Sequence, residues 1–244
     1  MVHWDILAAI FLTATIQSLF GVGVLLFGTP ILLVLGYEFI TALTVLLPIS
    51  LTINLVQVSK DYRHIHLPFY RRILTLSIPC VVLCLLVVTK LTINIGMFVG
   101  LFLIVVALKS VYPPFNRVIE SLVRYERTYF IVMGLIHGLT NLGGSLLTAI
   151  IHNKRYDKDT TRATTAVSYG TFALFQLLTL LLSLGPSSLG HPTTALYMSI
   201  GVGMFLATEL LLYAKIGADR YRTIFAGFLF LSGMALIFKS VFVH

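Results

Sequence analysis

Two glycine-rich stretches interrupt apolar segments of this chain at positions 120 residues apart. The first contains Gly21 and Gly23, and the second contains Asn141, Gly143 and Gly144. Glycine lacks Cβ, so it permits positive φ and close approach of two backbones. A helix broken inside a membrane exposes unbonded N–H groups at the start of its second half, and these groups attract anions together with the helix dipole. The stretches therefore predict a pair of anion-binding helix ends that need no charged side chain.

Uncharged polar side chains accompany both breaks. Gln17 and His137 each precede a break by one turn. Polar groups in lipid are costly unless they are paired or face a cavity, so they indicate either a binding site or hydrogen bonds between helices. His137 can change charge near neutral pH, which makes it a candidate carrier of a coupled proton. The candidate substrate-binding residues are Gln17, Gly21, Gly23, Asn54, Gln57, His137, Asn141, Gly143, Gly144, Thr165 and Ser168.

The composition places these residues in a membrane protein. Hydrophobic residues make up 58% of the chain and charged residues only 11%, whereas soluble domains carry about 25% charged residues. The 244 residues supply about eight membrane segments. The net charge of +8 comes from basic residues between apolar segments, so these residues predict orientation signals and contacts to lipid phosphates, not nucleic-acid binding.

We expect an all-α polytopic membrane protein built from two inverted repeats, each a glycine-broken, re-entrant helix followed by three spans. Basic residues concentrate in four connections, which run from Lys60 to Arg72, from Lys109 to Arg127, from Lys154 to Arg162 and from Lys215 to Arg222. The expected arrangement places all four on one face, as the positive-inside rule requires. The alternative for the second break is that 128–153 forms one ordinary span. The expected boundaries are 1–115 for the first repeat (broken helix 4–36, spans 40–59, 69–89 and 93–112), 116–127 for a polar connector, and 128–244 for the second repeat (broken helix 128–153, spans 164–184, 193–214 and 223–242).

Other residues with chemical potential have simpler interpretations. Cys80 and Cys84 lie four residues apart in one apolar segment and are expected to be small packing residues. Glu209 lies within an apolar window and would either carry protons or pair with a cation. No metal site is expected. The sequence contains no Gly-x-x-x-x-Gly-Lys-Ser/Thr loop, so a nucleotide-driven motor is not expected. We assign no cofactor.

At its glycine breaks the chain resembles the TauE/SafE family of membrane transporters, often called sulfite exporters. The first copy of the family motif reads Gly21-Val-Gly23-Val-Leu, with Pro30, Gly36, Ala42 and Thr44 following. The second copy reads Asn141-Leu-Gly143-Gly144-Ser145, with Arg162-Ala163-Thr164-Thr165 following. Neither copy keeps the full glycine triplet of the family, and the second lacks the proline. The resemblance implies outward movement of sulfite, sulfonates or related sulfur-containing anions across a bacterial inner membrane.

The sequence thus predicts a secondary transporter of small anions, bound at the membrane midplane and moved by alternating access. Its expected partners are a small anionic substrate and membrane lipids, while a coupled proton or sodium ion and a homodimer remain open. One alternative is a non-transporting scaffold or accessory subunit. The other is an intramembrane enzyme, which would need a nucleophile with a base, paired acids or a metal cluster. The apolar windows contain no such set, so we do not expect an enzyme.

Overall fold

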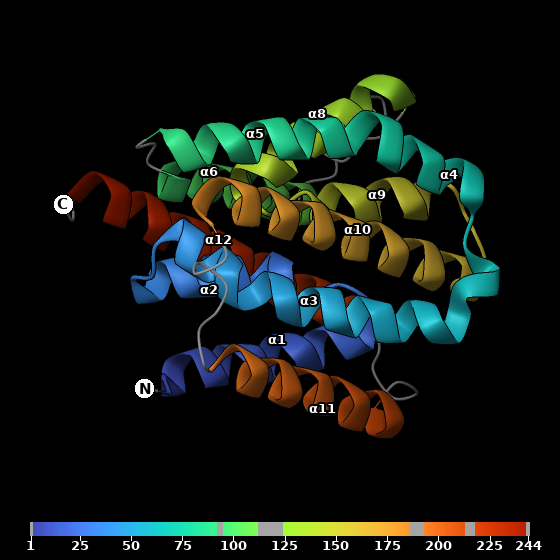
Figure 1. Cartoon of the computed structure of the whole chain (residues 1–244), viewed down its shortest axis with the longest axis horizontal. Coiled ribbons are helices and arrows are strands. Elements are labelled where there is room, and N and C mark those ends of the chain that lie inside the picture. Colours follow the sequence, from blue (N-terminus) through green and yellow to red (C-terminus); the bar gives the residue numbers. More distant parts are fainter. Residues whose placement is uncertain (1, 92–94, 112–123, 186–192, 213–217, 243–244) are drawn as a thin grey trace.

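The computed structural model describes residues 2–91, 95–111, 124–185, 193–212 and 218–242 (Figure 1). All regular elements of these residues are helical, which confirms the predicted all-α class. The helices are α1 (Trp4–Phe20), α2 (Val24–Leu35), α3 (Phe39–Asp61), α4 (Leu67–Arg72), α5 (Ile78–Lys90), α6 (Ile95–Val111), α8 (Glu126–Thr140), α9 (Gly144–Asn153), α10 (Lys158–Leu184), α11 (Thr194–Leu212) and α12 (Ala218–Phe242), with a 3-10 turn at Tyr62–His64 and a π-helical segment at Ile73–Ser77.

The helices follow the apolar runs, because lipid offers no hydrogen-bond partner to the backbone and a helix satisfies its own peptide groups. Within the described residues, Phe39–His64, Leu67–Lys90 and Lys158–Leu184 are long and apolar enough to cross a membrane. Shorter apolar helices accompany them, including Ile95–Leu108, Thr194–Leu210 and Phe230–Phe242. The division into repeats stays a prediction, and residues 116–123 of the expected connector lie outside the described residues.

Both expected helix breaks are present, and they share one backbone pattern. Gly21 ends α1 with φ 73°, and its N–H donates to Gln17 O at 2.8 Å. Asn141 ends α8 with φ 62°, and its N–H donates to His137 O at 2.8 Å. Glycine adopts this left-handed conformation without a steric cost, and asparagine is one of the few other residues that visit it routinely. Each left-handed residue therefore ends one helix so that the next can start in a new direction.

Each broken helix folds back on itself. Tyr37, just after α2, donates its hydroxyl hydrogen bond to Asp5 at the start of α1 at 2.8 Å. Lys154, just after α9, forms an ion pair with Glu126 at the start of α8. In both pairs the second helix thus returns toward the end at which the first begins. The α1–α2 pair opens at the left of Figure 1 and the α8–α9 pair at the right, so the two pairs open at opposite ends of the molecule.

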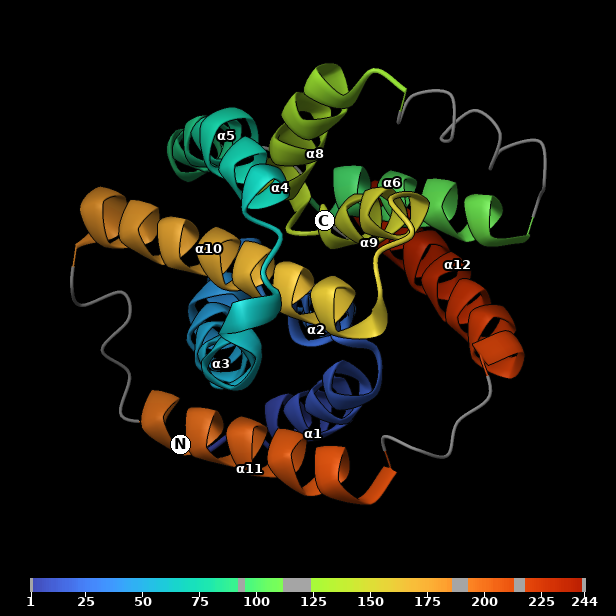
Figure 2. The same cartoon turned by 90° about the vertical axis from the view of Figure 1, so that its right-hand side faces the viewer.

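The remaining helices pack around these two pairs, with one helix beside the first helix of each pair. In Figure 2, α11 lies beside α1 and α5 beside α8, while α3 and α10 cross near the centre. The contact between α6 and α12 is nearly self-complementary. A Cβ on Gly100 would lie 2.9 Å from Gly233 O, and a Cβ on Gly233 would lie 2.8 Å from Gly100 O. Small residues at this crossing let the two backbones approach closely.

The predicted packing role of the two cysteines is confirmed. Both are free, and they face two glycines of α8. A Cβ on Gly134 would lie 3.0 Å from Cys80 Cβ, and a Cβ on Gly138 would lie 2.7 Å from Cys84 Cβ. The α5–α8 contact is therefore a small-residue interface.

Candidate functional site

The first break is lined by buried amides that bond to one another. Gln17 accepts a hydrogen bond from the N–H of Val24, the first residue of α2, at 3.0 Å. Its Nε2 donates to Asn54 Oδ1 on α3 at 3.5 Å, and Asn54 Nδ2 donates to Ser50 O at 2.7 Å. One of the N–H groups that we expected at the start of α2 is thus already held by a side chain. Leu25 and Leu26 also lie in the first turn of α2, where N–H groups have no intrahelical acceptor.

The second break is built in the same way from different residue types. His137 is fully buried, and its Nε2 lies 3.1 Å from Gln176 Oε1 on α10. In each half, therefore, the side chain one turn before the break contacts an amide of the next long helix. Asn141 Nδ2 donates to Thr29 Oγ1 on α2 at 2.9 Å, which connects the second break to the second part of the first broken helix.

At the start of α9, unlike at the start of α2, hydrogen bonds join residues only three apart in the chain. Ser145 N donates to Leu142 O at 3.2 Å, and Leu146 N donates to Gly143 O at 3.1 Å. These short-range bonds occupy amides that an ordinary helix start leaves free. Among the described residues, the N–H groups of Gly143 and Gly144 therefore have no backbone acceptor at this helix start.

Several buried side-chain atoms around the breaks have no hydrogen-bond partner among the described residues. They include Gln57 Oε1, His137 Nδ1, Asn141 Oδ1 and Gln176 Nε2. Buried polar atoms are nearly always bonded, so such a group of exceptions indicates a bound water, ion or ligand. Because the oxygen and nitrogen of a glutamine amide are assigned from their surroundings, Gln176 can offer either a donor or an acceptor.

Three glycines of the breaks, Gly23, Gly143 and Gly144, are required by close packing. A Cβ on Gly23 would lie 2.5 Å from Gln17 N, and a Cβ on Gly143 would lie 2.5 Å from His137 Cβ. Each glycine thus packs directly against the polar residue that precedes its break. At Gly144 a Cβ would lie 1.1 Å from the hydroxyl oxygen of Tyr169, so Tyr169 fills the space at the start of α9.

Tyr169 is the residue that sequence reasoning missed. It is buried on α10, and its position between Thr165 and Gln176 gives i, i+4 and i+11 spacing on one helical face. That spacing could have identified it. Phe172, on the same face, packs its ring against His137 with a centroid distance of 4.4 Å.

The other predicted site residues lie on the same two long helices. Gln57 is buried one turn beyond Asn54 on α3. Thr165 and Ser168 are buried on α10, but the Ser168 hydroxyl donates to Thr164 O of its own helix at 2.7 Å. The α3 and α10 backbones meet where a Cβ on Gly170 would lie 3.2 Å from Asn54 Cβ. The two helices thus form a polar centre between the breaks.

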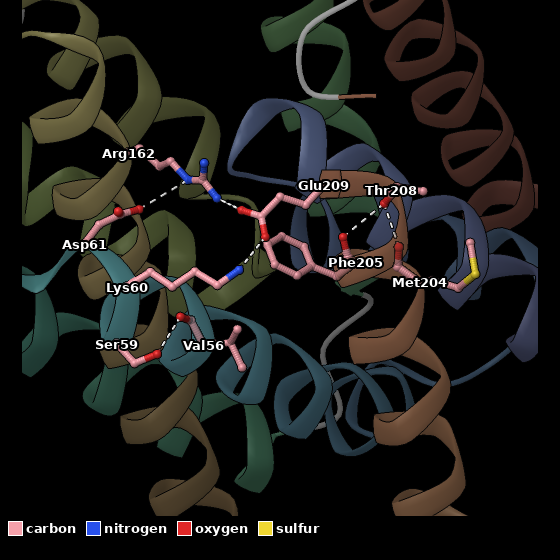
Figure 3. A network of polar contacts seen from close by, with 9 residues as sticks. All are labelled: Val56, Ser59, Lys60, Asp61, Arg162, Met204, Phe205, Thr208 and Glu209. Atoms are coloured by element: carbon pink, nitrogen blue, oxygen red, sulfur yellow. Dashed lines mark hydrogen bonds and ion pairs between the residues drawn. The ribbon is translucent and has the colours of Figure 1, made fainter. Parts of the chain in front are cut away.

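Glu209 pairs with cations, which is one of the two roles expected for it (Figure 3). One carboxylate oxygen lies 2.7 Å from Lys60 Nζ at the end of α3, and the other pairs with Arg162 near the start of α10. Arg162 Nε lies 3.6 Å from Asp61 Oδ2. This Glu209 network, formed by Lys60, Asp61, Arg162 and Glu209, joins three helices at the end where the α8–α9 pair opens.

The opposite end of the molecule carries a pocket rich in hydroxyl groups. A pocket of about 170 Å³ lies there, lined by His3, Ile6, Tyr37, Thr41, Thr44, Val45, Thr193, Thr194 and Tyr197. Burial and the hydrogen bond to Asp5 raise the pKa of Tyr37 to about 12. Its phenol therefore stays protonated at neutral pH and remains a donor. We refer to this feature as the hydroxyl pocket.

Comparison with known proteins fits this arrangement of paired helix breaks in an apolar helical bundle. No curated protein and no solved structure matched the chain. The model of one family, described as Sulfite exporter TauE/SafE, matches residues 6–236 and so covers both breaks and the long helices that follow them. The predicted resemblance is thereby confirmed, and this integral membrane protein belongs to the TauE/SafE family of sulfite exporters.

Proposed function

We propose that the chain is a secondary transporter that exports small sulfur-containing anions, such as sulfite or sulfonates, and binds them between its two broken helices. The family is one of transporters and not of enzymes. The observation that carries the proposal is the pair of matching breaks, each lined by buried neutral side chains with unpartnered polar atoms. A neutral site of this kind suits an ion that must be released again, because it binds without a permanent counter-charge.

The binding step would use donors from both breaks. At the first break the anion competes with Gln17 Oε1 for the N–H of Val24, which frees the Gln17 amide to turn toward it. At the second break the N–H groups of Gly143 and Gly144, with Gln176 Nε2, supply further donors. The positive ends of the α2 and α9 dipoles add to the attraction. Gln57, Thr165 and Ser168 would line the path along α3 and α10.

Alternating access would follow from an inverted arrangement of two re-entrant pairs. The Glu209 network holds α3, α10 and α11 together at one end, while the hydroxyl pocket lies at the other. Opening the end that carries the Glu209 network would require its ion pairs to separate and to become hydrated. By the positive-inside rule we assign the basic end to the cytoplasm and the hydroxyl pocket to the outer face of a bacterial inner membrane.

The test is anion binding by the purified full-length protein, measured as a shift in its thermal unfolding midpoint. Sulfite, sulfate, thiosulfate, small sulfonates, chloride and carboxylates would be compared at equal concentration. We expect the sulfur oxyanions to raise the midpoint selectively. The absence of a shift with every anion, in a protein that unfolds cooperatively, would contradict the proposal.

Two substitutions at Asn141 test whether the breaks form the site. Asn141→Gly keeps the positive φ and removes only the side chain, as in the first break, whereas Asn141→Leu also forces a poor conformation on the backbone. We expect Asn141→Gly to fold and to bind sulfite more weakly, and Asn141→Leu to be less stable as well. Unchanged sulfite affinity in a folded Asn141→Gly protein would exclude the Asn141 side chain from the site.

Coupling to protons would require His137, because it is the titratable residue at the breaks. His137→Gln copies Gln17 of the first break and can keep a hydrogen bond to Gln176. Transport in proteoliposomes should then persist but lose its response to an imposed proton gradient. A gradient response retained in His137→Gln would exclude His137 as the proton carrier, and no response in either protein would favour sodium coupling or uncoupled transport.

A further inference from the structure

A basic pocket lies far from the breaks, beside the start of α8 where this helix packs against α5. A pocket of about 800 Å³ is lined by Arg72, Thr75, Leu76, Arg124, Tyr125, Glu126, Arg127 and Thr128. Its α8 residues occupy the helix start, whereas the break follows Thr140 at the other end of the 15-residue helix. At 1.5 Å per residue the two places are about 20 Å apart. The pocket is therefore separate from the proposed transport site.

The charge of the pocket is not balanced within the described residues. Three arginines line it against one glutamate, and that glutamate already forms ion pairs with Arg72 and Lys154. Arg124 and Arg127 are exposed, and neither forms an ion pair in the part of the chain that the structure describes. Two guanidinium groups beside the start of a helix present donors and positive potential to a phosphate or another planar or tetrahedral anion.

The surface below the pocket is apolar and faces outward. On α8, Ile131 and Leu135 follow Thr128 at i+3 and i+7 and are each 39% exposed. On α5, Leu83 is 63% exposed. Residues at these spacings lie on one face of a helix. A ligand whose charged end occupies the arginine pocket would therefore extend over hydrocarbon-facing side chains of two neighbouring helices.

The local backbone is arranged around this seam. The π-helical segment Ile73–Ser77 precedes α5, and Thr75 within it lines the pocket. Ser77 donates to Phe130 O of α8 at 2.8 Å, which ties the segment to the neighbouring helix. Single π-helical turns in α-helices are frequent at functional sites, because the extra residue changes the direction of the side chains around it.

We propose that this pocket binds the phosphate of an anionic phospholipid, with the headgroup between Arg124 and Arg127 and the acyl chains along the α5–α8 seam. Basic pockets between membrane helices on the cytoplasmic side bind such headgroups through the same chemistry. The site does not depend on the transported anion. Its role is to bind lipid at the basic face of the protein.

The experiment compares lipids and a soluble phosphate on the delipidated full-length protein. Phosphatidylglycerol, phosphatidylcholine and inorganic phosphate would each be titrated, with the thermal unfolding midpoint and native mass spectrometry as readouts. We expect phosphatidylglycerol to raise the midpoint and to remain bound, and phosphatidylcholine and inorganic phosphate to do neither at the same concentration. An equal response to phosphatidylcholine would overturn the proposal. Saturation by inorganic phosphate with no further effect of phosphatidylglycerol would show a soluble-anion site instead.

Matched variants connect the effect to the pocket. At about 1 kcal/mol per basic residue, Arg124→Gln with Arg127→Gln should weaken phosphatidylglycerol binding about 30-fold. Arg63→Gln with Arg155→Gln removes the same charge from exposed residues outside the pocket and should leave binding unchanged. Arg124→Lys with Arg127→Lys should retain most of it. An equal loss of phosphatidylglycerol binding in the pocket variant and in the control variant would show that only net charge matters. That result would overturn the proposed site.

The transport proposal is checked separately in the same proteins. The response of Arg124→Gln/Arg127→Gln to sulfite should equal that of wild type, because neither arginine lies near the breaks. A salt titration of the wild-type protein tests the site without any substitution. Added salt should release phosphatidylglycerol if attraction between arginine and phosphate holds it. Retention of the lipid at high salt would contradict the assigned headgroup contact.

Discussion

At the scale of single residues, the start of α9 depends on the close contact between Gly144 and Tyr169. Tyr169 places its hydroxyl where any side chain at position 144 would begin, with only 1.1 Å between that oxygen and a Cβ on Gly144. The tyrosine is buried among aromatic neighbours, including His137 and Phe172. Neither partner can move far, because interiors are close-packed. Gly144 is thus needed for packing.

Substitution of Gly144 by alanine should destabilise the protein by about 1–3 kcal/mol or more through overpacking. Tyr169→Phe should not rescue it, because the same Cβ would lie 2.2 Å from Tyr169 Cζ. Tyr169→Leu should restore much of the stability, because leucine is shorter. The measurement is the thermal unfolding midpoint of each purified protein.

Gly203→Ala is the matched control, since a Cβ there meets nothing within 4 Å. Alanine should be tolerated at that helical position and even favoured over glycine. Equal losses of stability in Gly144→Ala and Gly203→Ala would contradict the close approach of Tyr169.

At the scale of elements, α10 begins with a side-chain cap. Asp157 accepts hydrogen bonds from Thr160 N at 2.9 Å and Asp159 N at 3.1 Å. These bonds, with that of Thr160 first, lower the pKa of Asp157 from its ordinary value of 3.8. The stability that the carboxylate contributes is therefore present above pH 3.8 and is lost as pH falls through the lower pKa of the folded state.

Asp157→Asn keeps a side-chain oxygen but removes the titration. The difference in unfolding midpoint between wild type and Asp157→Asn should be positive at neutral pH and should shrink as the pH is lowered below 3.8. Asp159→Asn, whose side chain accepts neither bond, serves as the control. A difference that stays constant with pH would mean that the carboxylate charge does not stabilise the cap.

The Glu209 network acts on three helices together, so its residues should not be equivalent. The Lys60 side chain is 46% exposed, whereas Glu209 and Arg162 are 12% and 18% exposed. Lys60→Met should cost less than about 1 kcal/mol, as exposed pairs do, and Glu209→Gln about 1–3 kcal/mol, because it leaves Arg162 poorly paired. Chemical or thermal unfolding would measure both values.

If the network closes the basic end, Glu209→Gln should also change transport. In proteoliposomes we expect its rate to differ from wild type by more than that of Lys60→Met, at a temperature at which all three proteins are folded. Identical rates in all three proteins would leave the network a stabilising role only.

At the scale of the whole molecule, the two broken pairs open at opposite ends (Figure 1). The Tyr37–Asp5 and Lys154–Glu126 contacts mark these ends. If the pairs are re-entrant and the halves inverted, residues just after α2 and just after α9 face opposite sides of the membrane. Basic side chains gather near the end at which the α8–α9 pair opens. From the positive-inside rule we predict that this end faces the cytoplasm.

Single cysteines test this topology in a Cys80→Ala/Cys84→Ala background. Glu38→Cys should react with a membrane-impermeant thiol reagent in intact cells, and Arg155→Cys only after the membrane is opened. Both positions are exposed, so access to the reagent depends on the side of the membrane. Labelling of both from the same side would exclude the inverted arrangement.

The sequence alone determined the class of the protein, the places of its helix breaks and its family. These properties are local: apolar runs must be helical in lipid, and Gly21 and Asn141 are residues that accept a positive φ. One helix boundary that was predicted from local polarity differs in the structure. The expected span 164–184 begins at Lys158 in the structure, because the capped first turn of α10 is charged and resembles a connection.

Only the tertiary structure decided which residues meet. The return of α2 to the start of α1, the pairing of Glu209 with Lys60 and Arg162, and the hydroxyl of Tyr169 over Gly144 all join residues far apart in the chain. Such contacts depend on how helices cross, and periodicity along one segment carries no information about its neighbours. The candidate site could therefore be predicted as a set of residue types, while its internal hydrogen bonds required the packed fold.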